Sequence, residues 1–111
     1  MKKIYYLKTC DSCRKTLKEM DITSYVLQEI KTEPITVKQL DELFKLTNSY
    51  EILFSKRAKK FTQMGLKSQK LTEKDYRQLI LEEYTFLKRP VIIDGNDIYI
   101  GNTKKRGGNF K

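Results

Sequence analysis

The chain has 111 residues, 39% of them hydrophobic, which is enough for one modest core, so we expect a single domain over residues 1–111. Its formal net charge of +9 favours phosphate-like oxyanions or acidic macromolecules as ligands, although a basic surface used only for solubility explains it equally well. The apolar runs are too short to cross a bilayer, the N-terminal residues do not resemble a secretory signal, and two cysteines without a histidine cannot complete a structural zinc site. We therefore expect a cytoplasmic protein with no membrane contact and no bound metal or cofactor.

The first predicted elements are a strand and a helix that meet at the cysteines. Residues 3–7 have the aromatic and β-branched content of a short buried strand. Residues 12–20 tolerate or favour a helix, with Cys13, Leu17 and Met20 spaced along one face. Cys10 then lies at the N-terminus of that helix.

The middle of the chain predicts a second strand followed by helices. Residues 24–30 form the strand, and a helix follows whose start is marked by Thr36 with Gln39 three residues on, the pattern of a capping box. Asn48 and Ser49 predict a break after it. Residues 55–61 are interpreted as a short helix that ends before Gly65.

The last third predicts an amphipathic helix and a hairpin. Apolar residues recur at helical spacing over 72–86, and that helix should end before Arg89 and Pro90. Residues 91–93 and 98–100 are apolar runs around the turn 94–97, which is the signature of a β-hairpin. We leave open whether 102–111 forms a short helix or a loose end. This order predicts an α/β protein with a mixed four-stranded sheet flanked by helices, as in a thioredoxin-like fold.

The terminal cations do not form a recognised nucleic-acid-binding module. Lys104, Lys105 and Arg106 are followed by a single aromatic residue, Phe110, which gives no stacking platform. We interpret the cluster as a solvated tail and expect no direct nucleic-acid contact.

The spacing of the cysteines favours redox chemistry over a structural disulfide. A bridge between Cys10 and Cys13 would close so short a loop that it would add little stability. At a helix N-terminus, unpaired amides and the helix dipole stabilise a thiolate, so Cys10 is a candidate nucleophile. Cys13 could attack an intermediate on Cys10 and release it as a disulfide, although a pair of inert buried thiols is the alternative. Without histidine, arginines must supply further stabilisation of the thiolate.

Three segments resemble the arsenate reductase (ArsC) and Spx family. Residues 6–17, with Cys10, Asp11, Ser12 and Cys13, resemble the cysteine loop of the family. Residues 52–66 resemble its arginine-bearing segment, and residues 87–93 resemble its Arg-Pro-hydrophobic motif, in matching order over nearly the whole chain.

The resemblance implies roles for individual residues. Cys10 would attack an oxyanion, while Arg57 and Arg89 would bind it, and Arg14 is a further candidate. Pro90 would be a cis proline that faces the cysteine. The alternatives without a functional role are that Arg57 belongs to a solvated run of cations, that Arg89 caps the preceding helix, and that Arg14 lies on the surface.

Two functions remain open on these grounds. The first hypothesis is an arsenate-reductase-like thiol oxidoreductase, expected to be a monomer, that acts on a small oxyanion or thiol with glutathione/glutaredoxin or thioredoxin as electron donor. Glutathione-dependent reductases of the family usually have serine at the position of Cys13 and a further arginine near Asn102. The second hypothesis is an Spx-like redox-sensing regulator that binds the RNA polymerase α-subunit. Spx proteins have the Cys13–Arg14 pattern, but they carry glycine at about the position of Ser49.

Overall fold

The computed structural model describes residues 1–101, which fall into two compact units. The first unit combines Met1–Pro34 with the chain from Arg89 onward, and the second is continuous over Ile35–Lys88. Within residues 1–101, no helix has the length and apolar character needed to cross a membrane. Asn102, the Lys104–Arg106 cluster and the choice between a terminal helix and a loose end lie outside the described residues. That residues 1–111 form a single domain stays a prediction.

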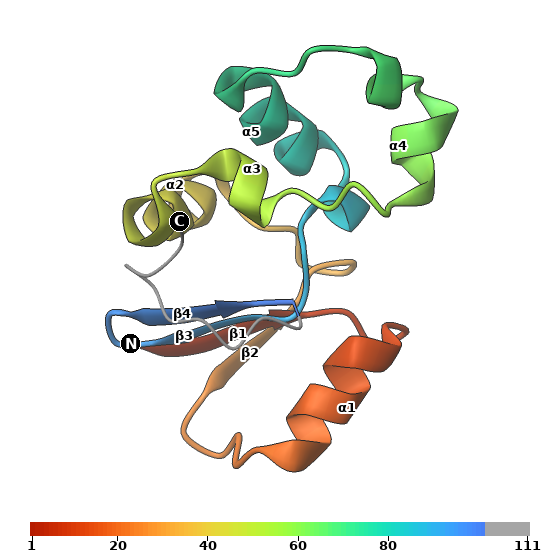
Figure 1. The fold of residues 1–111 in the computed structure, drawn as a ribbon. Coiled ribbons are helices and arrows are strands. Elements are labelled where there is room, and N and C mark those ends of the chain that lie inside the picture. The colour runs from red at the N-terminus through yellow and green to blue at the C-terminus, as the bar shows by residue number, and fades with distance from the viewer. Residues whose placement is uncertain (102–111) are drawn as a thin grey trace. The chain divides into compact units, whose positions relative to one another are not determined.

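The first unit is built on a mixed four-stranded sheet (Figure 1), as the sequence predicts. Its strands lie in the order β2-β1-β3-β4, with β1 parallel to β2 and antiparallel to β3, and β3 antiparallel to β4. In the centre, Ile4 of β1 lies opposite Leu27 of β2 and Ile92 of β3. The strand bounds are Lys2–Tyr6 for β1, Val26–Glu29 for β2, Val91–Asp94 for β3 and Asp97–Ile100 for β4.

Helix α1 (Asp11–Glu19) connects the parallel strands β1 and β2, which a tight turn cannot join. Figure 1 shows it along one face of the sheet. Cys13 is its one residue that is fully buried, with none of its surface exposed. The predicted helical face therefore points toward the core at Cys13, and Cys10 lies at the N-cap as expected.

The second unit is helical (Figure 1). Capping boxes at Thr36 with Gln39 and at Thr72 with Asp75 start its two longest helices, and Asn48, with a left-handed φ of 59°, ends the first of them. Both the predicted capping box and the predicted break after it are confirmed. The helices are α2 (Val37–Thr47), α3 (Tyr50–Leu53), α4 (Lys59–Gln63) and α5 (Glu73–Glu82), with the 3₁₀ turns η1 (Leu66–Ser68) and η2 (Tyr84–Phe86).

Two helix predictions were wrong in part. Residues 55–58 are not helical: the Ser55 N–H donates to the Phe86 carbonyl at 2.7 Å instead of to a helix, and residues 56–58 form a turn and a bend before α4. The helix predicted over 72–86 ends at Glu82, and its last residues form η2 instead. Helix α3 was not predicted.

An aromatic cluster forms the core of the second unit. Phe54 is 1% exposed, and its ring lies 4.9 Å from the rings of both Tyr76 and Phe86 and 5.9 Å from that of Phe61. Phe54 also forms an isolated antiparallel bridge with Leu87. This core joins the chain after α3 to the chain that leads into Arg89.

Candidate functional site

Cys10 occupies the junction between β1 and α1. It is the N-cap of α1, with extended φ and ψ of −87° and 121°. Its N–H donates to the Leu7 carbonyl and its carbonyl accepts from the Arg14 N–H, both at 3.1 Å. These bonds fix the backbone so that the side chain lies beside the first amides of the helix, and the sulfur remains partly exposed. The residue is therefore both held in place and open to a reactant.

The surroundings of Cys10 favour its anionic form. Burial by itself would raise the pKa of the thiol, whereas hydrogen bonds from the backbone N–H and the S–H of Cys13 lower it. The positive charge of Arg89 and the N–H of Ser12 lower the pKa further. The net pKa of Cys10 lies below that of an ordinary cysteine, as the helix N-terminus predicts.

Cys13 is perturbed in the opposite direction. Burial raises the pKa of its thiol to about 12, and the hydrogen bond and negative charge of Cys10 act in the same direction. The Leu7 backbone and the charge of Arg89 oppose this rise without cancelling it. The thiol of Cys13 is thus harder to ionise than that of an ordinary cysteine and the thiol of Cys10 is easier to ionise, a division of roles within one sulfur pair. In residues 1–101, no three metal-binding side chains group together around these sulfurs or elsewhere.

Arg89 and Pro90 lie in the same unit as the cysteines. The positive charge of Arg89 lowers the pKa of both thiols, so the structure brings these three residues together. The Arg89–Pro90 peptide bond is cis, and Pro90 is buried with its carbonyl accepting from the Gly101 N–H at 2.8 Å. The end of β4 therefore holds the backbone next to Arg89.

Arg14 faces solvent at the start of α1. Its guanidinium donates to the Asp11 carboxylate, and the two side chains are 59% and 91% exposed. Sequence reasoning did not use this pair, although oppositely charged residues three positions apart in a helix are expected to interact. Arg14 therefore already has an anionic partner, and its binding of a ligand anion stays a prediction.

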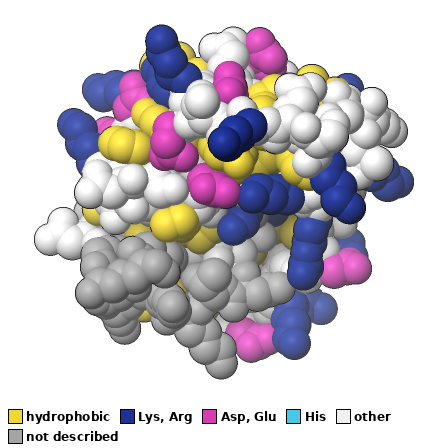
Figure 2. Space-filling view, turned by 45° about the horizontal axis from the view of Figure 1, so that its top comes forward, with side chains coloured by type: hydrophobic (Ala, Val, Ile, Leu, Met, Phe, Trp, Pro, Cys, Tyr) yellow, Lys and Arg dark blue, Asp and Glu magenta, His cyan; other side chains and the backbone are white. Residues whose placement is uncertain are grey.

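Arg57 lies in the second unit and is exposed in the turn before α4. Its charge acts on Lys88, together with the charges of Lys56 and Glu51, in a cluster that sequence reasoning missed. Burial lowers the pKa of Lys88, as do the charges of Lys56 and Arg57, while Glu51 opposes the shift. Figure 2 shows Lys and Arg side chains spread over the visible surface. Among so many lysines, the sequence does not indicate that Lys88 is the half-buried one. Its position directly before the Arg-Pro motif was the one available signal.

Hydrogen bonds within the second unit pair the residues that precede Arg57 with those that precede Arg89. The Lys88 N–H donates to the Leu53 carbonyl at 2.8 Å, next to the bridge between Phe54 and Leu87. Arg57 follows Phe54 by three residues, and Arg89 follows Leu87 by two. The two motifs that the resemblance singled out thus continue from one backbone pairing.

Comparison with known proteins places these features in a family. The model of the ArsC family matches residues 5–110. The global transcriptional regulator Spx of Bacillus subtilis is 29% identical over 102 residues, covering 88% of this chain and 77% of its own, and Spx 2 of Bacillus anthracis is 31% identical over 103 residues with the same coverage. An arsenate reductase from Vibrio cholerae has a TM-score of 0.77 at 14% identity, covering 90% of this chain and 88% of that one. This likeness confirms the thioredoxin-like fold class.

Proposed function

The chain belongs to the ArsC family, and from this we propose that it is a thiol oxidoreductase of the arsenate-reductase type, with Cys10 as nucleophile and Cys13 as resolving thiol. The observation that carries the proposal is the opposite environment of the two sulfurs. Cys10 is partly exposed with a lowered pKa, whereas Cys13 is buried with a raised pKa. A nucleophile needs an exposed sulfur with a lowered pKa. A resolving thiol, which reacts only in the second step, can stay buried and protonated until then.

In the first step, the Cys10 thiolate attacks the central atom of a tetrahedral oxyanion such as arsenate. A sulfur–arsenic bond forms, an arsenic–oxygen bond breaks, and the oxygen leaves as water after it takes up protons from solvent. Arg89 would balance the negative charge that gathers at this point, since guanidinium groups pair well with tetrahedral oxyanions. Arg57 and Arg14 are proposed as further anion-binding residues.

In the second step, Cys13 attacks the sulfur of Cys10. Once Cys10 is covalently bonded to arsenic, it no longer carries the charge that raises the pKa of Cys13, so Cys13 loses its proton more readily. The new disulfide forms as the sulfur–arsenic bond breaks. The electron pair of the broken bond stays on arsenic and reduces it from the +5 to the +3 state. The disulfide then regains two electrons and two protons from two thiols of a glutathione/glutaredoxin or thioredoxin system.

The proposal is tested by coupled arsenate reduction with each thiol system offered separately. Wild type should turn over, and Cys10→Ser should lose activity to background, while Lys15→Gln on the exposed side of α1 serves as the control. Equal rates for wild type and Cys10→Ser would remove Cys10 from the mechanism. If Cys13→Ser keeps its turnover only with glutathione, a single-cysteine route replaces the resolving step.

A second function is favoured by the Spx relatives, which match 88% of this chain at 29% and 31% identity. The same sulfur pair could act as a redox switch on a regulator that binds the RNA polymerase α-subunit. At the position of the Spx glycine, Ser49 caps α3 by accepting from the Ile52 N–H at 3.1 Å. Replacing that cap by glycine should cost only a few tenths of a kcal/mol, so Ser49→Gly is a usable probe.

A pull-down against the polymerase α-subunit separates the two functions. Wild type and Ser49→Gly are compared in the reduced and the oxidised state, with Cys10→Ser as the variant that cannot form the disulfide. Binding that depends on the redox state, together with no arsenate turnover, would replace the enzyme by the regulator. Turnover without binding would leave the enzyme as the sole candidate.

A further inference from the structure

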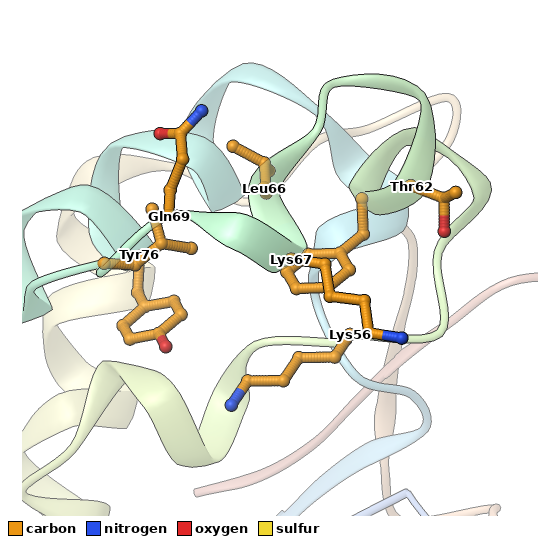
Figure 3. A pocket seen from close by; sticks show the side chains of 8 residues that line it. Lys56, Thr62, Leu66, Lys67, Gln69 and Tyr76 are labelled. Atoms are coloured by element: carbon orange, nitrogen blue, oxygen red, sulfur yellow. The ribbon is translucent and has the colours of Figure 1, made fainter.

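The second unit contains a cavity of about 470 Å³ between α4, η1 and the start of α5 (Figure 3). This volume lies within the range of about 300–1,000 Å³ that is usual for small-molecule sites. All of its lining residues come from the unit 35–88, so the cavity is formed within one compact unit.

The inner wall of the cavity is apolar and fixed. Phe61, Leu66 and Tyr76 are each less than 10% exposed, and Leu71 lies beside them. The ring of Tyr76 is held 4.9 Å from that of buried Phe54, so this wall belongs to the aromatic core of the unit. An apolar ring or branched chain that entered the cavity would meet a surface that does not need to rearrange.

The polar part of the lining is cationic. Figure 3 shows the Lys56 side chain extending toward the Tyr76 side, whereas Lys67 lies on the side of Thr62. The Lys56 ammonium is already 2.9 Å from a Glu51 carboxylate oxygen. Within residues 1–101, no carboxylate lies within ion-pair distance of Lys67. The lining thus presents one cation with a partner and one without, and no acidic side chain.

We propose that this cavity binds a small organic anion whose carboxylate pairs with Lys67 and whose aromatic or branched apolar group packs against the inner wall. The amide of Gln69 and the hydroxyl of Thr62, which also line the cavity, can donate hydrogen bonds to the same carboxylate. An anion without an apolar group would leave the wall unused, and an uncharged ring would leave Lys67 without its counter-ion. The site therefore selects for both features together.

The test is a titration of the full chain followed by ¹⁵N NMR with three probes: phenylacetate, its uncharged amide phenylacetamide, and acetate. Phenylacetate should shift the amide signals of Thr62, Leu66 and Gln69, with a Kd of about 1–10 mM, as expected for so small a ligand. The two control probes should bind at least about threefold more weakly, since each lacks one of the two features. Equal binding of phenylacetamide, equal binding of acetate, or shifts that map outside the cavity would each overturn the proposal.

Paired variants separate a site at Lys67 from general attraction to a basic protein. Lys67→Gln should weaken phenylacetate binding by about three- to tenfold, whereas Lys74→Gln, which removes an exposed cation that does not line the cavity, should leave the Kd unchanged. Both variants change exposed side chains, so their NMR spectra should stay those of the folded chain. Equal losses in the two variants would refute the role of Lys67.

Discussion

Replacing Phe54 by alanine should destabilise the protein more than any other single truncation in the second unit. The side chain is 1% exposed and contacts three other rings, so its loss leaves a cavity that rigid neighbours cannot fill. The expected cost is about 3–5 kcal/mol. Phe54→Leu keeps most of the volume and loses the ring contacts, which predicts a cost of about 1–2 kcal/mol. For a chain of this length, the alanine variant would lose a large part of the total stability.

The measurement is urea unfolding followed by far-UV circular dichroism. Phe44→Ala provides the matched control, because Phe44 is only partly buried and stacks on one ring, that of Tyr50, at 4.4 Å. It should cost about 1–2 kcal/mol. If Phe44→Ala proved as costly as Phe54→Ala, the assignment of Phe54 to the centre of the core would be wrong. Phe54→Ala also tests the candidate site, because Phe54 pairs with Leu87, which precedes Arg89 by two residues.

The remaining predictions concern titration and capping. Alkylation of Cys10 by iodoacetamide, followed by mass spectrometry, should speed up with rising pH around a midpoint below the ordinary cysteine pKa, and a midpoint at or above it would contradict the thiolate. Arg89→Gln should move that midpoint upward, slowing alkylation at pH 7 by about two- to tenfold, and an unchanged midpoint would exclude Arg89 from the site. Hydrogen bonds from Arg77 lower the pKa of Asp41, so the stability lost in Asp41→Asn should be seen at pH 7, shrink as the pH falls below the ordinary aspartate value of about 3.9, and vanish below the lowered pKa of the folded state. Thr72→Ala should cost about 1 kcal/mol in urea unfolding by removing a capping box, and a loss below 0.3 kcal/mol or so would count against that box.

The features that could be predicted from the sequence are those fixed by neighbouring residues. Three such features each depend on residues only a few positions apart: the capping box at Thr36, the break at Asn48 and the hairpin turn at Gly95. The position of Cys10 followed in the same way, because the strand before it and the helix after it have clear and different periodicities.

The features that could not be predicted depend on distant partners. Helix α3 is short, and its first N–H groups, those of Tyr50 and Glu51, donate to the carboxylate of Glu73 from α5. The non-helical chain at Ser55 likewise depends on the Phe86 carbonyl. The half-burial of Lys88 has the same origin, since tertiary packing decides which of many lysines loses its water.

The order in which the parts of the site occur along the chain has a consequence for protein synthesis. Cys10 is made early, but Arg89 and the strand β3 that pairs with β1 are made only after the entire helical unit 35–88. A nascent chain therefore exposes the thiol long before the guanidinium that helps to ionise it exists. Ribosome-bound chains stalled before residue 89 should be alkylated at Cys10 more slowly at neutral pH than the finished protein, so the sulfur gains its full reactivity only when the fold around it is complete.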